Sequence, residues 1–326
     1  MLSKKFEGSH FEIGKSFGEF CVRNRINLPE IAPFAIDESR KQFAKECYGI
    51  YKRYFPEILE EIEGIEQAGN FENGVLSTLL FSMYCIGEQA HCSSFVYQAE
   101  NGFILGRNSD FLSVLKDLSM HCEYCLKENH SFIGNTTAYV EMEDGMNEKG
   151  LCIAFTSVVP KKVKAGFNSG LLLRYGLEKC ASVEEFVQAV YALPIASAQT
   201  YIAMDQKQAV LIECDGEKVA VEVLKKEGYL CAVNRFNLPQ MQSEALEVAD
   251  DWQAKERYQT MQRALKKQGK NIAFAKTLCK GEYGFMCQYE KNSGKDTVWS
   301  VIYHGQGMEL AKGNPQEQEY EHVDLL

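Results

Sequence analysis

The chain has 326 residues, of which 45% are hydrophobic, and a formal net charge of −10. This apolar fraction predicts a globular protein with a sizeable core. The negative charge, without any stripe of Lys and Arg, argues against nucleic-acid binding. The first residues are charged, and no stretch has the length of a signal-peptide core or a membrane span, so we expect a soluble, cytoplasmic protein with no membrane partner.

Helical patterns dominate residues 1–85. In PEILEEIEGIEQAGN, residues 56–70, Pro56 suits the start of a helix and Gly69-Asn70 suits its end. Between them, apolar residues recur at the spacing of one helix face. These residues are Ile58, Leu59, Ile62 and Ile65.

The pattern changes to strands near residue 92. CSSFVYQ (92–98) and FILGRN (103–108) are separated by Glu100-Asn101-Gly102, and Asn-Gly readily adopts the positive φ of a tight hairpin turn. Further runs rich in β-branched and aromatic residues predict additional strands. They are residues 138–142, 151–158, 200–205, 209–215, 229–234 and 297–304.

Helices are expected between the groups of strands. Ser182 and Glu185 form a capping box ahead of an apolar run, and residues 251–268 have helical composition without Gly or Pro. Grouped hairpins with helices before and between them predict stacked layers of sheet and helix, an α+β fold. No repeat or linker divides the chain, and the clearest boundary lies near Cys92.

Cys92 is a candidate nucleophile. A cysteine reacts as its thiolate and needs a base, and neighbouring His91 would point to the opposite face of a strand. If the bond between His91 and Cys92 is cut, Cys92 gains an α-amino group with a pKa of roughly 8, which can take the thiol proton. The twelve cysteines are otherwise expected to be reduced thiols used in packing.

A charged cluster, Arg107-Asn108-Ser109-Asp110, lies in the partner strand of the hairpin. Arg107 would favour the thiolate or orient a substrate carbonyl, and Asp110 would hold the new ammonium and Arg107 in place. Taken alone, these residues also fit a polar strand end with a surface ion pair, and Cys92 also fits a small buried strand residue.

Four motifs in order carry a resemblance: CSSF, GRNSDF, DGMNEKGL (144–151) and AVNRF (232–236). Together they resemble the N-terminal-nucleophile cysteine hydrolases of linear amides, which include choloylglycine hydrolases and penicillin V acylases. The branch of acyl-coenzyme A:6-aminopenicillanic acid acyltransferases is the most similar, because GSHFEIGKSFG near the start and TVWSVIYH near the end also match its termini.

This resemblance implies a four-layer αββα sandwich and a precursor that cleaves itself between His91 and Cys92. Residues 1–91 would be a helical pro-segment or small subunit, and residues 92–326 the catalytic domain, held together as one unit. By position in the motifs, Cys92 would be the nucleophile with Arg107 and Asp110 beside it. Asn147 and Asn234 would donate amide N–H groups to the oxyanion or hold the substrate carbonyl, and Arg257, in DWQAKERY, would match a later family arginine.

The implied activity is hydrolysis or transfer of an acyl group from a linear, non-peptide amide or a thioester, through a Cys92 thioester. The partner would be a small-molecule amide or acyl thioester; no cofactor or metal is expected, and self-association into a homo-oligomer is compatible with the sequence.

Three alternatives stay open. The protein could be an uncleaved, non-catalytic binding protein with the same fold. Asn147 could be a turn residue. His121, Cys122 and Cys125 could form a metal or redox site, although no second Cys or His pair completes four ligands.

Overall fold

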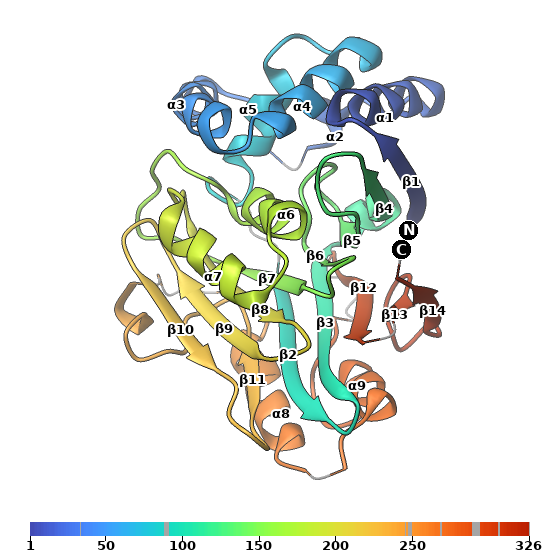
Figure 1. Ribbon diagram of the computed structural model, residues 1–326, viewed down its shortest axis with the longest axis vertical. Coiled ribbons are helices and arrows are strands. Elements are labelled where there is room, and N and C mark those ends of the chain that lie inside the picture. Colours follow the sequence, from blue (N-terminus) through green and yellow to red (C-terminus); the bar gives the residue numbers. More distant parts are fainter. Residues whose placement is uncertain are drawn as a thin grey trace.

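Two β-sheets packed face to face form the centre of the protein (Figure 1). The computed structural model describes residues 1–32, 34–87, 91–244, 246, 250–267, 269–288, 294–305 and 307–325. Within these residues, one sheet has eight strands in the order β1-β4-β5-β6-β7-β8-β9-β10. Their bounds are β1 Leu2–Gly8, β4 Met120–Leu126, β5 Phe132–Thr136, β6 Asp144–Asn147, β7 Cys152–Val158, β8 Ala198–Met204, β9 Ala209–Cys214 and β10 Val219–Val223.

The second sheet has six strands among the described residues, in the order β11-β2-β3-β12-β13-β14. Strands β2 and β3 contact β7 and β8 of the first sheet, so the inner faces share one core. Burial on both faces explains why β7, CIAFTSV, has no exposed residue. The bounds are β11 Tyr229–Ala232, β2 His91–Ala99, β3 Gly102–Leu112, β12 Lys295–His304, β13 Gly307–Ala311 and β14 Glu321–Asp324.

Helices cover both outer faces of the two sheets. Helices α6 (Ser169–Lys179) and α7 (Val183–Ala192) pack on the first sheet, and α8 (Ala254–Leu265) and α9 (Ile272–Cys279) pack on the second. The predicted α+β fold with αββα layers is therefore confirmed. None of the helices in the described part of the chain has both the length and the apolar character needed to cross a bilayer.

The N-terminal helices gather at one end of the molecule, at the top of Figure 1. Helices α1 and α4 cross with their backbones in contact, since a Cβ added at Gly14 would overlap the carbonyl oxygen of Glu61. The predicted helix from Pro56 ends at Gly69 as expected, with Asn70 in the left-handed conformation. The five helices described here are α1 His10–Asn24, α2 Leu28–Ile31, α3 Glu38–Tyr54, α4 Pro56–Gly69 and α5 Val75–Ser82.

Two local predictions are wrong. Residues 2–8 form strand β1, paired parallel with β4. The hydrogen bonds that hold this strand come from β4, and the polar sequence LSKKFEG by itself does not indicate a strand. The strand expected over residues 138–142 is a series of turns in which Tyr139 has φ 63°, and the strand of this region is β5 instead. The helix expected over residues 251–268 is α8, and Gln268 lies outside the described residues.

The predicted hairpin and the remaining strands are confirmed. Strand β2 pairs antiparallel with β3 across Glu100-Asn101, and Gly102 has φ 114°. Strands β7, β8, β9, β11 and β12 overlap the other five predicted strands. Ser182 caps α7 by accepting a hydrogen bond from the Glu185 N–H.

A buried ion cluster joins the N-terminal helices to the layer that covers the first sheet. Arg174 of α6 lies 2.8 Å from Glu61 of α4, measured from Nη2 to Oε2, and its Nε donates to Glu178. His10 of α1 reaches the other oxygen of Glu178 at 2.8 Å. The three charged side chains are at most 1% exposed, so their pairing is protected from water.

We expect Glu61→Ala to lower the free energy of unfolding by about 3 kcal/mol, because it leaves the buried Arg174 charge with one carboxylate fewer. Urea unfolding followed by circular dichroism measures the change. Glu38→Ala, which removes a surface pair with Lys41, is the matched control and should change little. Equal midpoints for the two variants would contradict the stabilising role of the cluster.

Candidate active site

Cys92 is the second residue of β2 and is completely buried. In the register of the hairpin, Cys92 lies opposite Ser109 and Ser94 lies opposite Arg107. Side chains alternate along a strand, so Cys92, Ser109 and Arg107 share one face of the second sheet. The hairpin alone therefore brings a thiol, a hydroxyl and a guanidinium together.

Arg107 is the closest cation to the thiol. Its Nη2 lies 3.0 Å from Cys92 Sγ and 3.1 Å from Glu143 Oε2, while its Nη1 lies 2.8 Å from Asp144 Oδ2. Asp144 is the first residue of β6 in the first sheet and Glu143 directly precedes it, so Arg107 reaches from the second sheet to the first beside the sulfur. Burial raises the pKa of the Cys92 thiol to about 12 and Arg107 opposes this, which leaves the thiol protonated at neutral pH in the intact chain.

Glu143 is a site residue that the sequence reasoning missed. One of its oxygens accepts hydrogen bonds from Arg107 and from Ser109 Oγ at 3.1 Å, and the other accepts from Thr137 N at 2.9 Å. Tyr84 OH also donates to it at 3.2 Å. The signal for Glu143 is its position directly before the DGMNEKGL motif, although the same residues also fit a strand followed by a turn.

Asp110 lies on the other face of β3. Its Oδ1 accepts from Thr297 Oγ1 at 2.6 Å, its Oδ2 accepts from Gln288 Nε2 at 3.3 Å, and Arg257 Nη1 lies 3.9 Å from Oδ2. Burial raises the pKa of Asp110 to about 6, opposed by Arg257. The predicted pairing of Arg107 with Asp110 is thus replaced by two separate sets of partners, one on each face of β3.

Asn234 and Arg257 hold the main chain of Cys92. The Cys92 N–H donates to Asn234 Oδ1 at 2.9 Å, and Arg257 Nη1 donates to the Cys92 carbonyl oxygen at 2.6 Å. Arg257 Nη2 also donates to Asn234 Oδ1 at 3.1 Å. Cys92 is therefore held at its nitrogen, its carbonyl oxygen and its sulfur by three of the residues that the sequence singled out.

Asn147 lies in a different network at the end of β6. Its Nδ2 donates to the carbonyl oxygens of Leu177 at 2.9 Å and Cys180 at 2.8 Å, and its Oδ1 accepts from the N–H groups of Lys149 and Leu151. These bonds join the turn after β6 to the end of α6. The structure does not bring Asn147 into the hydrogen bonds described around Cys92, and its oxyanion role stays a prediction.

His91 covers the other side of the Cys92 main chain. Its ring stacks on Trp252 with centroids 4.3 Å apart and an angle of 7° between the rings. Burial, aided by Arg257, lowers the pKa of His91 to about 3, so the ring is neutral at pH 7. His91 pairs with Asp110 in the hairpin and thus faces away from the thiol, as the sequence predicted.

The rival site does not converge. His121, Cys122 and Cys125 all lie on β4, where Cys122 and Cys125 are three residues apart and so face opposite sides. His121 Nδ1 lies 3.1 Å from Asn135 Oδ1. This arrangement does not support a metal or redox site.

Glu213 of β9 positions the segment that follows Asn234. Its carboxylate accepts the N–H groups of Asn237 at 2.7 Å and Leu238 at 3.0 Å. Burial raises the pKa of Glu213 to about 7 despite these two bonds. The folded protein therefore keeps a proton on Glu213 over a pH range in which the unfolded chain has lost it.

We expect the stability contribution of this proton to be present below about pH 4.5 and to be lost as the pH rises to about 7. The wild type should therefore lose stability relative to Glu213→Gln across this window, by about 1.4 kcal/mol per unit of pKa shift. Urea unfolding of both proteins at pH 5 and pH 7.5 measures the difference. A difference that grows in the opposite direction would contradict the raised pKa.

The fold and this site define a class of protein. An αββα sandwich, with a cysteine near the start of a central strand of one inner sheet and an Arg beside its sulfur, matches the N-terminal-nucleophile hydrolases that the motifs imply. The family model of acyl-coenzyme A:6-aminopenicillanic acid acyltransferases matches residues 97–316, more than half of the chain. The chain belongs to this family, and so to the hydrolases and acyltransferases of the N-terminal-nucleophile type.

Comparison with solved structures gives distant likenesses. The N-acylethanolamine-hydrolyzing acid amidase ortholog of Caenorhabditis elegans is 18% identical with a TM-score of 0.48, covering 65% of this chain and 92% of its own. Penicillin V acylase from Agrobacterium tumefaciens is 14% identical with a TM-score of 0.44, covering 68% and 83%. A conjugated bile acid hydrolase mutant from Clostridium perfringens is 12% identical with a TM-score of 0.39, covering 72% and 97%. Among curated proteins, none matches the sequence significantly.

Proposed function

We propose that this chain is a self-processing enzyme that hydrolyses linear amides or transfers acyl groups from amides or thioesters. The observation that carries the proposal is the triple hold on Cys92: Arg107 at its sulfur, Asn234 at its N–H and Arg257 at its carbonyl oxygen. A cysteine used only for packing needs no such partners, whereas a nucleophile that becomes a chain end must be held in place.

Maturation would begin with attack of the Cys92 sulfur on the carbonyl carbon of His91. The C–N bond breaks, the nitrogen takes a proton to become the α-amine, and His91 is left as a thioester on the sulfur. Water then hydrolyses this thioester to a free carboxylate and the thiol. The products are residues 1–91 and 92–326, which the shared core and the Arg174–Glu61 ion pair would hold together.

In turnover, the new α-amine takes the thiol proton, and the thiolate attacks the substrate carbonyl. Arg107 stabilises the thiolate, since a cation near a thiol favours its charged form. The leaving amine or thiol takes the proton back, and water or an acceptor amine releases the acyl group from the thioester. Asn234, already within hydrogen-bond distance of the Cys92 nitrogen, orients the amine, and its amide N–H is the proposed donor to the oxyanion.

Substrate access depends on the same cleavage. Cys92 is completely buried in the intact chain, and His91 is stacked on Trp252 beside it. Once the bond is cut, His91 is no longer tethered to Cys92 and can leave the Trp252 ring. The substrate would be a small-molecule amide or acyl thioester that enters where His91 lay.

Intact-mass spectrometry of freshly purified protein tests the proposal. We expect two fragments, one of which begins at Cys92, and covalent acylation of the larger fragment at Cys92 by a thiol-reactive substrate analogue. A single full-length chain that is not labelled at Cys92 would instead indicate an uncleaved binding protein with this fold.

A further inference from the structure

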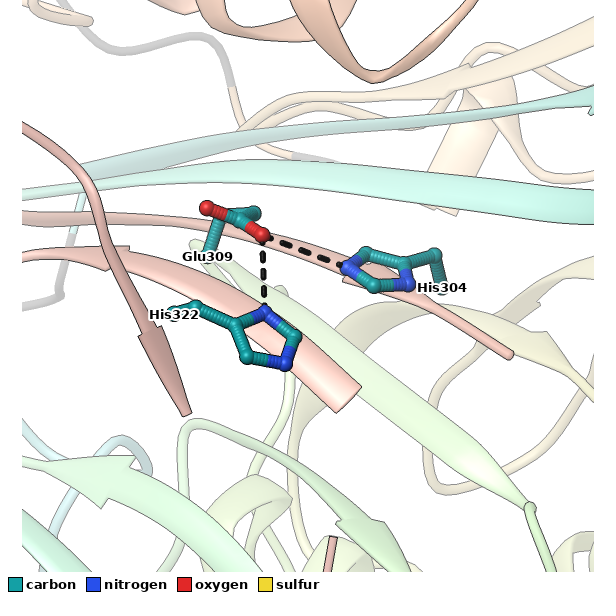
Figure 2. A group of neighbouring side chains, drawn as sticks. All are labelled: His304, Glu309 and His322. Carbon is teal, nitrogen blue, oxygen red and sulfur yellow. Dashed lines mark hydrogen bonds and ion pairs between the residues drawn. The ribbon is translucent and has the colours of Figure 1, made fainter. Parts of the chain in front are cut away.

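A second group of chemically reactive side chains lies on β12, β13 and β14, at the far edge of the second sheet. Figure 2 shows the rings of His304 and His322 converging on the carboxylate of Glu309. The ligand atoms of these three residues all lie within 4.8 Å of one another. Among the described residues, these side chains are the one group of at least three His, Cys, Asp or Glu residues whose possible ligand atoms lie this close together.

The register of the sheet produces this convergence. Glu309 of β13 lies directly opposite His322 of β14 and opposite Ile302 of β12, and His304 is two residues beyond Ile302. Residues two apart on a strand share a face, so all three side chains project on one side of the sheet. Direct and diagonal neighbours on one face are close enough to touch.

Gly307 lies in a tightly packed position beside His322. It lies between His304 and Asp324 in the register and has φ 141°, a conformation that favours glycine. A Cβ at this position would overlap the Val323 carbonyl oxygen and lie 3.4 Å from the His322 Cε1 atom. A side chain at position 307 would therefore displace the β14 backbone next to His322.

We propose that His304, Glu309 and His322 form a binding site for one divalent transition-metal ion, with zinc the best fit. Two imidazole nitrogens and one carboxylate oxygen are a familiar zinc ligand set that leaves a fourth position for water. Glu309 Oε1 lies 2.9 Å from His322 Nδ1 and 3.6 Å from His304 Nε2. Bonds of about 2.0–2.2 Å to a central ion require only small side-chain movements from these positions.

The surrounding groups fix the mode of binding. Lys276 Nζ lies 2.8 Å from Glu309 Oε2, so the carboxylate offers its other oxygen, Oε1, to the ion as a single ligand. His322 Nε2 lies 3.3 Å from Asp324 Oδ1, which leaves Nδ1 for the ion. A carboxylate on the second nitrogen of a metal-binding histidine is a common orienting contact.

This site is separate from Cys92. Val301 of β12 pairs with Arg107, and His304 lies three residues further along the strand, about 10 Å away at roughly 3.3 Å per residue. Residues three apart on a strand face opposite sides, so His304 projects away from the face that carries Arg107 and Cys92. The ion would hold together three neighbouring strands, including the edge strand β14, and would take no part in the Cys92 reaction.

The test uses the full chain after removal of bound metal with a chelator. Zinc chloride is titrated by calorimetry, and cobalt chloride by absorption spectroscopy, which distinguishes imidazole and carboxylate ligands from cysteine thiolates by the absence of a sulfur-to-cobalt charge-transfer band. We expect one equivalent of zinc to bind. The variant His304→Gln/His322→Gln should lose at least about 100-fold in affinity, since even loss of an outer contact costs about 10- to 100-fold.

His130→Gln is the matched control, because it removes one histidine that pairs with a carboxylate, Glu148, elsewhere on the surface. It should bind zinc as the wild type does. His322→Gln alone, at a ring that is 44% exposed, provides a variant whose folding is not in question. Unchanged zinc affinity in the double and single variants, a thiolate band with cobalt, or no zinc binding by the wild type would each overturn the proposal.

Discussion

Replacing Cys92 by Ala is expected to leave a single full-length chain and to reduce amide or thioester turnover by at least about 10⁴-fold. In the proposed mechanism both results have one cause, because the same sulfur would attack the His91 carbonyl during maturation and the substrate carbonyl afterwards. Removal of a nucleophile in other enzymes leaves only the catalysis supplied by binding and oxyanion donors. Intact mass and steady-state kinetics measure the two effects.

Cys125→Ala is the control, since it removes a cysteine of β4 that the structure places in another layer. It should be cleaved and active. A further variant, Cys92→Ser, replaces the thiol by a hydroxyl of similar size, which is a weaker nucleophile, and should be cleaved slowly. Complete cleavage of Cys92→Ala before residue 92 would show that another group or a contaminating protease cuts the chain.

Replacing Arg107 by Met is expected to damage both folding and catalysis. The change leaves Glu143 and Asp144 buried without their shared cation, and breaking a buried pair in this way costs about 3–5 kcal/mol. It also removes the positive charge 3.0 Å from the Cys92 sulfur, so we expect a loss of about 100-fold or more in kcat/KM. Urea unfolding and kinetics at several pH values measure the two losses.

A triple variant separates the two roles of Arg107. Adding Glu143→Gln and Asp144→Asn to Arg107→Met removes the unpaired charges, so stability should recover in part while activity stays low. Arg235→Met, at an exposed arginine next to Asn234, should have neither effect. Recovery of activity together with stability would mean that Arg107 acts only through packing and not on the thiol.

The most deeply buried strands could be predicted because their sequences are rich in apolar and β-branched residues. AVLIEC of β9 and CIAFTSV of β7 are mostly apolar, and every residue in them is buried. The strands that were missed are short or polar, such as EHVD of β14 and LSKKFEG of β1. Strand β1 depends on hydrogen bonds from β4, which is distant in sequence and cannot be inferred from a local pattern. Strand β14 is short and mostly exposed, so it lacks the apolar pattern of a strand.

The site shows the same limit in finer detail. The motifs located Cys92, Arg107 and Asn234. They also contained Asp144, but they did not indicate that Asp144 and the preceding Glu143 contact Arg107, because that contact crosses from one sheet to the other. The sequence alone could have predicted that Arg107 and Asp110 lie on opposite faces of their strand. Residues three apart on a strand face opposite sides, and the hairpin had already been predicted from Asn101-Gly102.

The hydrogen bond between Arg257 and the Cys92 carbonyl joins residues 165 positions apart. A ribosome finishes the first of these residues long before the second, and the chain must also add β11 beside β2 before Asn234 can reach Cys92. Cleavage before Cys92 would therefore depend on synthesis having passed Arg257. A nascent chain that stops before residue 257 is expected to remain in one piece, so only chains extended past this residue would expose a working nucleophile.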